Sequence, residues 1–197
     1  MKVYRAKLKS ECGLLYNRGF EQEAEAQKRD GESDDAREGR CWRMRAHANE
    51  DGFAVIQGIF FKNSIHEAAR YRSDKVPGSR GKLFTKIFEA SVTVYDPIVT
   101  AVKVENLKGI TMYVPSDGKH GSGKRVWKTF PVLEKWEGSI DIIVMDPRIT
   151  REVLFNTLAT AGAFIGVGGR RPANRGDFGR FNVLELEEVQ QPEPLAA

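Results

Sequence analysis

Strand-like and helix-like segments alternate along this sequence in an order that few folds accommodate. Residues 3–9 alternate between polar and apolar side chains, which is the period of a half-buried strand. Apolar residues recur at helical spacing over 61–71 and again after Thr150, a residue type suited to begin a helix. Further strands are expected at three segments, 91–95, 139–145 and 181–186. With shorter pieces set aside, the predicted order is strand, helix, strand, strand, helix, strand.

This order matches the βαββαβ plan of ferredoxin-like and RRM-like folds, an α+β class with an antiparallel sheet and both helices on one face. The sequence has no internal repeat, so we expect a single domain over 1–186. Two elaborations interrupt the plan, a charged insertion at 19–51 and a projecting basic hairpin arm at 110–130. The insertion is polar on all sides and could form a solvated helix near 21–28 or a mobile loop. We expect the mobile loop, and a disordered acidic tail at 187–197.

The composition of the 197 residues excludes several classes of protein. Apolar residues make up 41% and charged residues 29%, which argues against a disordered or collagen-like chain. No segment approaches the ~18 consecutive apolar residues of a membrane span, and the first residues lack the apolar stretch of a secretory signal. We therefore expect a cytoplasmic protein with no membrane partner. The net charge of +4 favours an anionic partner only weakly.

Motifs for metals, nucleotides and catalysis are incomplete. The two cysteines, Cys12 and Cys41, lack the paired spacing of a zinc or redox site. The segment GKHGSGK at 118–124 resembles a phosphate-binding loop, but Arg125 replaces the hydroxyl residue that reaches magnesium and the next residues favour a strand. None of the three histidines is visibly paired with a nucleophile or an orienting carboxylate. We therefore expect no metal, no cofactor and no enzymatic activity.

Glycines and arginines are concentrated in the connection at 162–181. Glycines let backbone amides approach a phosphodiester closely, and arginines add charge and planar bidentate donors. The alternative is a glycine-rich connection whose arginines only solvate the surface. The candidate nucleic-acid-binding residues in this connection are Gly166, Gly168, Gly169, Arg170, Arg171, Arg175 and Arg180.

Two further basic stretches add to the same hypothesis. One covers 62–86 and contributes the candidates Lys62, Arg70, Lys82 and Lys86. The other is the hairpin arm, with the candidates Lys119, Lys124, Arg125, Trp127 and Lys128. Cations beside an exposed aromatic ring neutralise phosphates and stack bases, although Trp127 could equally be buried. Such a surface suits single strands, whose bases are free, better than a duplex.

The segments GVGGRRP at 166–172 and GDFGRF at 176–181 resemble the glycine-rich loop and final strand of the RAMP superfamily, the RNA-recognition-like backbone subunits of CRISPR complexes. The whole chain is similar to small, free-standing RAMP-like proteins of phages and prophages. That pattern appears in FFKNSIHEAA at 60–69, PSDGK at 115–119 and FPV at 130–132. The resemblance implies a βαββαβ core, a projecting hairpin, binding of single-stranded nucleic acid and head-to-tail assembly along it.

Three functional hypotheses follow. The leading one is a non-enzymatic protein that binds single-stranded DNA or RNA largely without sequence preference and forms homo-oligomers along the strand, in a phage replication or CRISPR setting. The second is a RAMP-type endoribonuclease in which His47 or His66 acts as general base and the glycine-rich loop holds the phosphate. The third is a protein-interaction factor that docks on a CRISPR complex. The residues do not choose between DNA and RNA.

Overall fold

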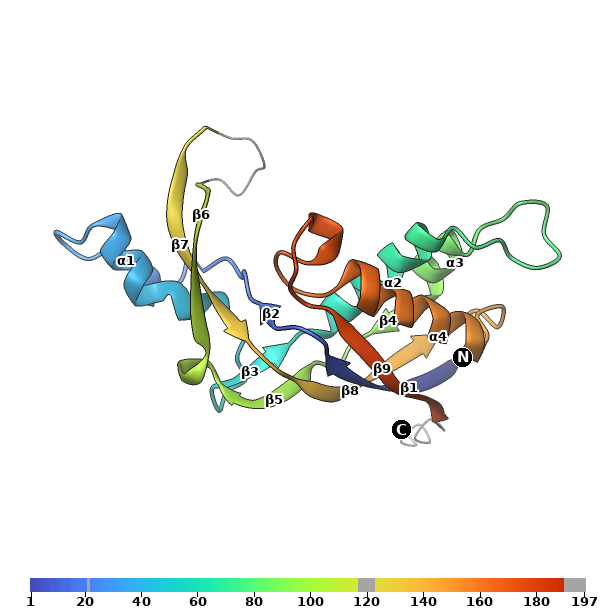
Figure 1. Ribbon diagram of the computed structural model, residues 1–197. Helices are drawn as coiled ribbons and strands as arrows, with labels where there is room; N and C mark the ends of the chain where they lie inside the picture. Colours follow the sequence, from blue (N-terminus) through green and yellow to red (C-terminus); the bar gives the residue numbers. More distant parts are fainter. Residues whose placement is uncertain (21, 117–122, 190–197) are drawn as a thin grey trace.

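A computed structural model describes residues 1–20, 22–116 and 123–189 of the chain as an α+β protein with antiparallel sheets (Figure 1). The largest sheet has the strand order β4-β8-β1-β9. Its strands are β1 (Lys2–Ser10), β4 (Val92–Val94), β8 (Glu137–Val144) and β9 (Phe181–Val189). The helices α2 (Gly58–Arg72) and α4 (Arg151–Thr160) lie together on one face of this sheet, and α3 (Phe84–Ser91) lies beside α2 (Figure 1).

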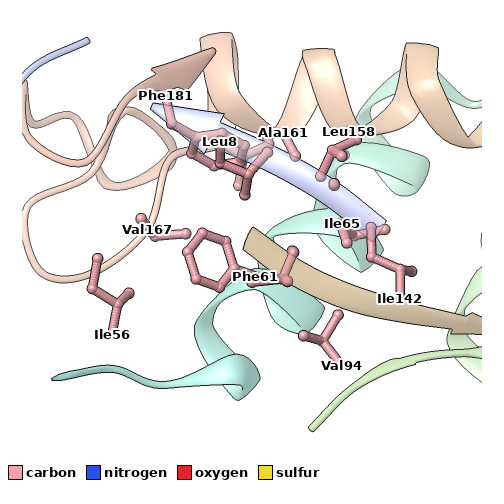
Figure 2. Close-up of a cluster of buried hydrophobic side chains, with 14 of the residues drawn as sticks. Leu8, Ile56, Phe61, Ile65, Val94, Ile142, Leu158, Ala161, Val167 and Phe181 are labelled. Carbon is pink, nitrogen blue, oxygen red and sulfur yellow. The ribbon is translucent and has the colours of Figure 1, made fainter. Parts of the chain in front are cut away.

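The alternation of residues 3–9 predicts which face of β1 is buried. Tyr4, Ala6 and Leu8 are at most 1% exposed and face the helices. Phe61 of α2 packs edge-on against Phe181 of β9 at 5.8 Å between ring centroids, and Figure 2 shows both rings in the cluster around Leu8. Burying a side chain of this size stabilises the fold by about 1.5–3 kcal/mol. The core therefore lies between the four-stranded sheet and its helices.

The opposite face of the same sheet is open and carries paired charges. Arg5 forms an ion pair of 2.7 Å with Asp141 on the adjacent strand, and Lys7 lies 3.3 Å from Glu137. Because basic side chains of β1 meet acidic side chains of β8, this face holds little uncompensated positive charge.

A three-stranded sheet carries the arm that projects from the body. Its order is β2-β7-β6, with strands β2 (Leu14–Leu15), β6 (Lys108–Pro115) and β7 (Arg125–Leu133). The β6–β7 hairpin pairs Lys108 with Val132 and continues to Pro115 opposite Arg125, which is where the sequence predicts an arm (Figure 1). A separate two-stranded sheet joins β3 (Phe53–Ile56) to β5 (Ile98–Lys103).

The inserted segment forms short helical elements within its described residues. The described part of the stretch 21–28 contains a single 3-10 turn, Ala24–Ala26. It is followed by α1 (Asp34–Cys41), whose first turn is capped by the Ser33 hydroxyl, 3.1 Å from the amide of Ala36. The Glu38 carboxylate accepts a hydrogen bond of 3.0 Å from the Thr129 amide of β7, and it forms an ion pair of 2.8 Å with Arg45. The sequence of this polar segment predicts no packing face, because Glu38 and Arg45 bind backbone groups of Thr129 in the hairpin.

The last strand is longer than predicted. β9 continues through Val189, which pairs with Val3 of β1, so residues 187–189 belong to the sheet and not to the predicted tail. Residues 190–197, the remainder of that tail, lie outside the described residues. Among the helices of the described chain, none combines the length and apolar character needed to cross a bilayer.

Candidate nucleic-acid interface

A cleft of about 480 Å³ opens where the loop after β1, the first half of α2 and the glycine-arginine connection meet. The connection contributes Gly166, Val167, Gly168, Gly169, Arg170, Arg171 and Asn174. The other segments contribute Leu15, Asn17, Arg18, His47, Phe60 and Asn63. The structure thus brings five of the predicted site residues, all from 166–171, into one concave site.

Backbone hydrogen bonds hold the glycine-rich loop against the segment that follows β1, at Gly13 and Leu15. The Gly169 amide donates to the Leu15 carbonyl at 2.7 Å, and the Gly179 amide donates to the Gly13 carbonyl at 2.8 Å. Gly168 has a φ of +79°, and a Cβ there would lie 2.8 Å from the Leu15 oxygen. A side chain at this position would therefore separate the two walls of the cleft.

Leu15 also connects the cleft to the arm. On one side it pairs with Val132 of β7, and on the other it forms an isolated bridge with Gly169. The arm and the glycine-arginine connection rise on the same side of the body, with β2 between them (Figure 1). One short strand therefore positions both candidate surfaces.

The charged side chains among the described lining residues are Arg18, Arg170 and Arg171. Arg18 is held by Glu23 at 2.6 Å, and Arg171 is held by Glu67 of α2 at 2.8 Å. Arg170 is exposed, has a φ of +48°, and forms no ion pair within the described part of the chain. Arg170 is therefore the cation of the cleft most available to an anionic ligand.

His47 lines the same cleft, whereas His66 does not. The His47 ring packs edge-on against Phe60 at 5.5 Å and Tyr16 at 6.4 Å. Burial lowers the pKa of His47 below its ordinary value of 6.5, and the positive charge of Arg18 lowers this pKa further. His47 is therefore mostly neutral at pH 7. The Nε2 atom of His66 lies 2.9 Å from the Val92 carbonyl, toward the sheet.

Sequence reasoning missed the amide side chains of the site and Arg18. Asn17, Asn63 and Asn174 come from three segments far apart in the chain, and each brings a donor and an acceptor to the cleft. Asn17 and Arg18 follow the loop that pairs with the glycine-rich connection, but their spacing forms no recognisable motif. The pairing of Leu15 with Gly169 places this segment beside the connection, and the Arg18 amide donates to the Arg45 carbonyl at 3.0 Å.

The arm presents a second candidate surface. The rings of Trp127 and Tyr113 lie 5.1 Å apart on neighbouring strands, and Trp127 is 61% exposed. Arg125 lies 5.3 Å over the Tyr113 ring and donates to the Tyr113 carbonyl at 2.5 Å. Lys128 donates to the Ser116 carbonyl, and Lys124 lies with it in a hollow beside α1. Lys119 lies outside the described residues.

The remaining predicted site residues are dispersed. Arg70 and Lys86 both bind Glu89 at 3.0 Å, which compensates part of the charge in this stretch. Lys62 on α2 and the exposed Lys82 in the loop before α3 lie outside the cleft lining. Two arginines of the connection also lie outside that lining: Arg175 is exposed, and Arg180 donates to the Ala163 carbonyl.

No metal cluster accompanies these surfaces within the part of the chain that the structure describes, since no group of three or more His, Cys, Asp and Glu side chains could hold an ion there.

No protein-family model and no curated protein matches the sequence. Solved structures similar to the chain include one in the cryo-EM structure of the type III-B Cmr-beta bound to cognate target RNA, with a TM-score of 0.47 and 9% identity over 96% of this chain and 61% of that one. Cmr6 from Pyrococcus furiosus has a TM-score of 0.43 and 15% identity over 91% of this chain and 97% of its own. A CRISPR RNA-guided surveillance complex contains a third, with a TM-score of 0.40 and 9% identity over 98% of this chain and 72% of that one.

These three structures are of the kind that the sequence resemblance to the RAMP superfamily indicates. Because every TM-score is below 0.5, neither family membership nor a function follows from the likeness. The chain spans 61% of the length of the first of these structures.

Proposed function

We propose that this protein binds single-stranded nucleic acid largely without sequence preference, with the cleft as its phosphate-binding site and the arm as a base-stacking surface. The observation that carries the proposal is the convergence of Arg170, the glycine-rich backbone and three asparagines on one cleft. Phosphodiesters are recognised by arginine and by closely approaching amides, independently of base identity.

The shape of the two surfaces favours a single strand over a duplex. The cleft is a concave site between α2, β2 and loops, and it presents no projecting helix for a major groove. On the arm, Trp127 and Tyr113 offer exposed ring surface beside Arg125, and a base must be unpaired to stack there. The open face of the four-stranded sheet is a weaker candidate because its arginine and lysine side chains are paired with carboxylates.

The proposal includes two finer points. The four-stranded sheet is a ferredoxin-like unit, which is supported by the chain order β1, α2, β4, β8, α4, β9 and by the strand order β4-β8-β1-β9. The protein forms homo-oligomers along the strand and does no chemistry on it. The proposal of a homo-oligomer rests on the resemblance of the sequence to the RAMP superfamily. Phage replication and a CRISPR setting would each supply a single strand of nucleic acid.

The test is a titration of labelled single-stranded DNA, single-stranded RNA and duplex at two salt concentrations, with light scattering to follow particle size. We expect salt-sensitive binding of single strands and growing particles. Replacing both Arg170 and Arg171 by alanine should weaken binding of unrelated sequences alike. The salt dependence should become shallower by about 0.7 for each phosphate that the protein no longer neutralises.

A matched control removes the same charge elsewhere. The double variant Arg5→Ala, Lys7→Ala loses two cations from the open sheet face and should retain most of the affinity and the salt slope. No binding at low salt would contradict the proposal and favour the protein-interaction factor. Equal losses of affinity in the two double variants would show that net charge, and not the cleft, governs binding.

A second function, RAMP-type endoribonuclease, is favoured by one observation. His47 lies in the cleft beside the glycine-rich loop, and its lowered pKa keeps a free nitrogen lone pair at neutral pH. In such a reaction His47 would accept the proton of an RNA 2′-hydroxyl as its oxygen attacks the adjacent phosphorus. The bond from phosphorus to the 5′-oxygen of the next nucleotide would break, water would protonate that oxygen, and a 2′,3′-cyclic phosphate would remain.

The two functions are separated by RNA cleavage. The endoribonuclease predicts cleavage of single-stranded RNA that His47→Ala abolishes and His66→Ala leaves intact, because His66 bonds toward β4 outside the cleft. Stable binding of intact RNA by the unaltered protein would rule out this second function and leave the first.

A further inference from the structure

An exposed pair of stacked aromatic rings lies outside the cleft. Tyr71 at the end of α2 and Phe164 stack with ring centroids 5.7 Å apart and planes 17° apart, and the two residues are 63% and 57% exposed. Phe164 belongs to the π-helical turn Ala161–Ile165 that follows α4, the wider turn that often marks a functional site. Rings of this size usually bury their faces, so an exposed pair suggests a ligand with a flat apolar surface.

One face of α2 connects this pair to the cleft. Phe60, Asn63, Glu67 and Tyr71 follow one another at intervals of three, four and four residues, which places them in a single stripe along the helix. Phe60 and Asn63 line the cleft. Tyr71 lies about 12 Å further along the axis than Asn63 at the helical rise of 1.5 Å per residue.

The charges along this stripe are compatible with a polyanion. Glu67 is the acidic residue of the stripe, and Arg171 of the cleft neutralises it at 2.8 Å. Next to the aromatic pair, Arg180 donates to the Ala163 carbonyl at 3.2 Å and Arg72 donates to the Thr160 hydroxyl at 3.1 Å. Arg180 thus lies on the π-helical side of the rings, whereas Arg72 on the α2 side is ion-paired with Asp74 at 2.6 Å.

We infer that Tyr71 and Phe164 form a base-stacking platform for the same single strand that occupies the cleft. The strand leaves the glycine-rich loop along the α2 stripe, and an unpaired base stacks on the exposed ring surface. This inference rests on the proposed function, since it needs a strand in the cleft. Continuity with the cleft and the nearby Arg180 favour a nucleobase over an apolar protein segment as the occupant.

The experiment separates stacking from phosphate binding. The probes are oligo(dT) and oligo(rU) of about sixteen nucleotides, each compared with an abasic strand of equal length that keeps the phosphates and lacks the bases. Tyr71→Ala and Phe164→Ala should each weaken binding of the base-bearing strand by roughly five- to 100-fold. The same variants should bind the abasic strand as the unaltered protein does. Tyr71→Phe keeps the ring and should retain the affinity.

Controls make the failures distinguishable. Tyr95 is 71% exposed and lies outside the cleft lining. Tyr95→Ala should therefore change neither the affinity for the base-bearing strand nor that for the abasic strand. Arg170→Ala should weaken both strands, and if it weakens neither, the proposed function fails and the platform with it. If Arg170→Ala weakens binding but Tyr71→Ala leaves the affinity for both strands unchanged, the platform alone is overturned. The same holds if Tyr71→Ala lowers the affinity for both strands equally. If Tyr71→Ala or Phe164→Ala alters self-association of the protein and leaves nucleic-acid binding unchanged, the platform is also overturned. The two rings would then form a protein contact.

Discussion

Arg171 and Glu67 form an ion pair of 2.8 Å at the boundary between the cleft and the exposed face of α2. Their side chains are 20% and 35% exposed, so the pair is partly shielded from solvent. Glu67 thereby compensates one of the arginines that the sequence predicts as ligands of a phosphate, and it leaves Arg170 as the unpaired one among the described lining residues.

Removing the carboxylate of this pair should strengthen nucleic-acid binding. In Glu67→Gln, Arg171 is released to contact one more phosphate, so we expect roughly fivefold tighter binding at low salt and a salt slope steeper by about 0.7. Fluorescence anisotropy at several salt concentrations measures both. Glu89→Gln makes the same change of net charge beside Arg70 and Lys86, away from the cleft, and should have a smaller effect. Equal effects would show that Arg171 is not released toward the strand.

His47 should titrate below its ordinary pKa of 6.5, because burial and the charge of Arg18 both disfavour its protonation. The folded protein then binds this proton more weakly than the unfolded chain, so His47 reduces stability as the pH falls below 6.5. NMR titration of the ring protons measures the pKa directly. Arg18→Ala should raise the pKa only part of the way to 6.5, because burial is the larger cause, and Arg5→Ala on the distant sheet face should not move it. A pKa at or above 6.5 in the unaltered protein would contradict the packing of His47.

The ion pair of Glu38 and Arg45 should stabilise the docking of the inserted segment on the arm. Their side chains are 19% and 5% exposed, and Arg45 also donates to the Thr129 carbonyl at 3.2 Å. Arg45→Met leaves a mostly buried carboxylate without its partner, so we expect a loss of about 3 kcal/mol in the free energy of unfolding, measured in urea. Lys28→Met removes an exposed ion pair of the same segment and should cost less than about 1 kcal/mol. Similar losses of stability would show that the segment is not anchored by this pair.

Gly179 should tolerate no side chain. Its φ is +80°, and a Cβ would collide with the carbonyl of Val167, whose amide donates back to the Gly179 carbonyl. Gly179→Ala combines left-handed strain of about 1–2 kcal/mol with this collision, and it should destabilise the protein by more than the strain alone. Gly31 has a φ of +71° and open space within 4 Å of the position that a Cβ would take, so Gly31→Ala reports the strain without the collision. Equal thermal shifts for the two variants would mean that the loop rearranges to accept alanine.

The regular part of the fold could be predicted because its elements have clear periods. The alternation that buries Tyr4, Ala6 and Leu8 is visible in residues 3–9, and the helical stripe with Phe61 is visible in 61–71. The docking of the inserted segment on the arm could not be predicted, because Glu38 and Arg45 bind backbone groups of a distant strand. Such interactions leave no period in the sequence.

Local periodicity and residue type are sufficient for the α+β class, the antiparallel strands and the presence of a glycine-arginine connection, and all of these can be read from the chain alone. Which of those residues act together depends on the folded arrangement. The hydrogen bond between Gly169 and Leu15 brings Asn17 and Arg18 to the cleft. Acidic side chains on α2 and α3 compensate arginines and lysines that the sequence presents as free. The physical reason is that charge compensation and cleft formation depend on distances between residues far apart in the chain, which neither composition nor spacing records.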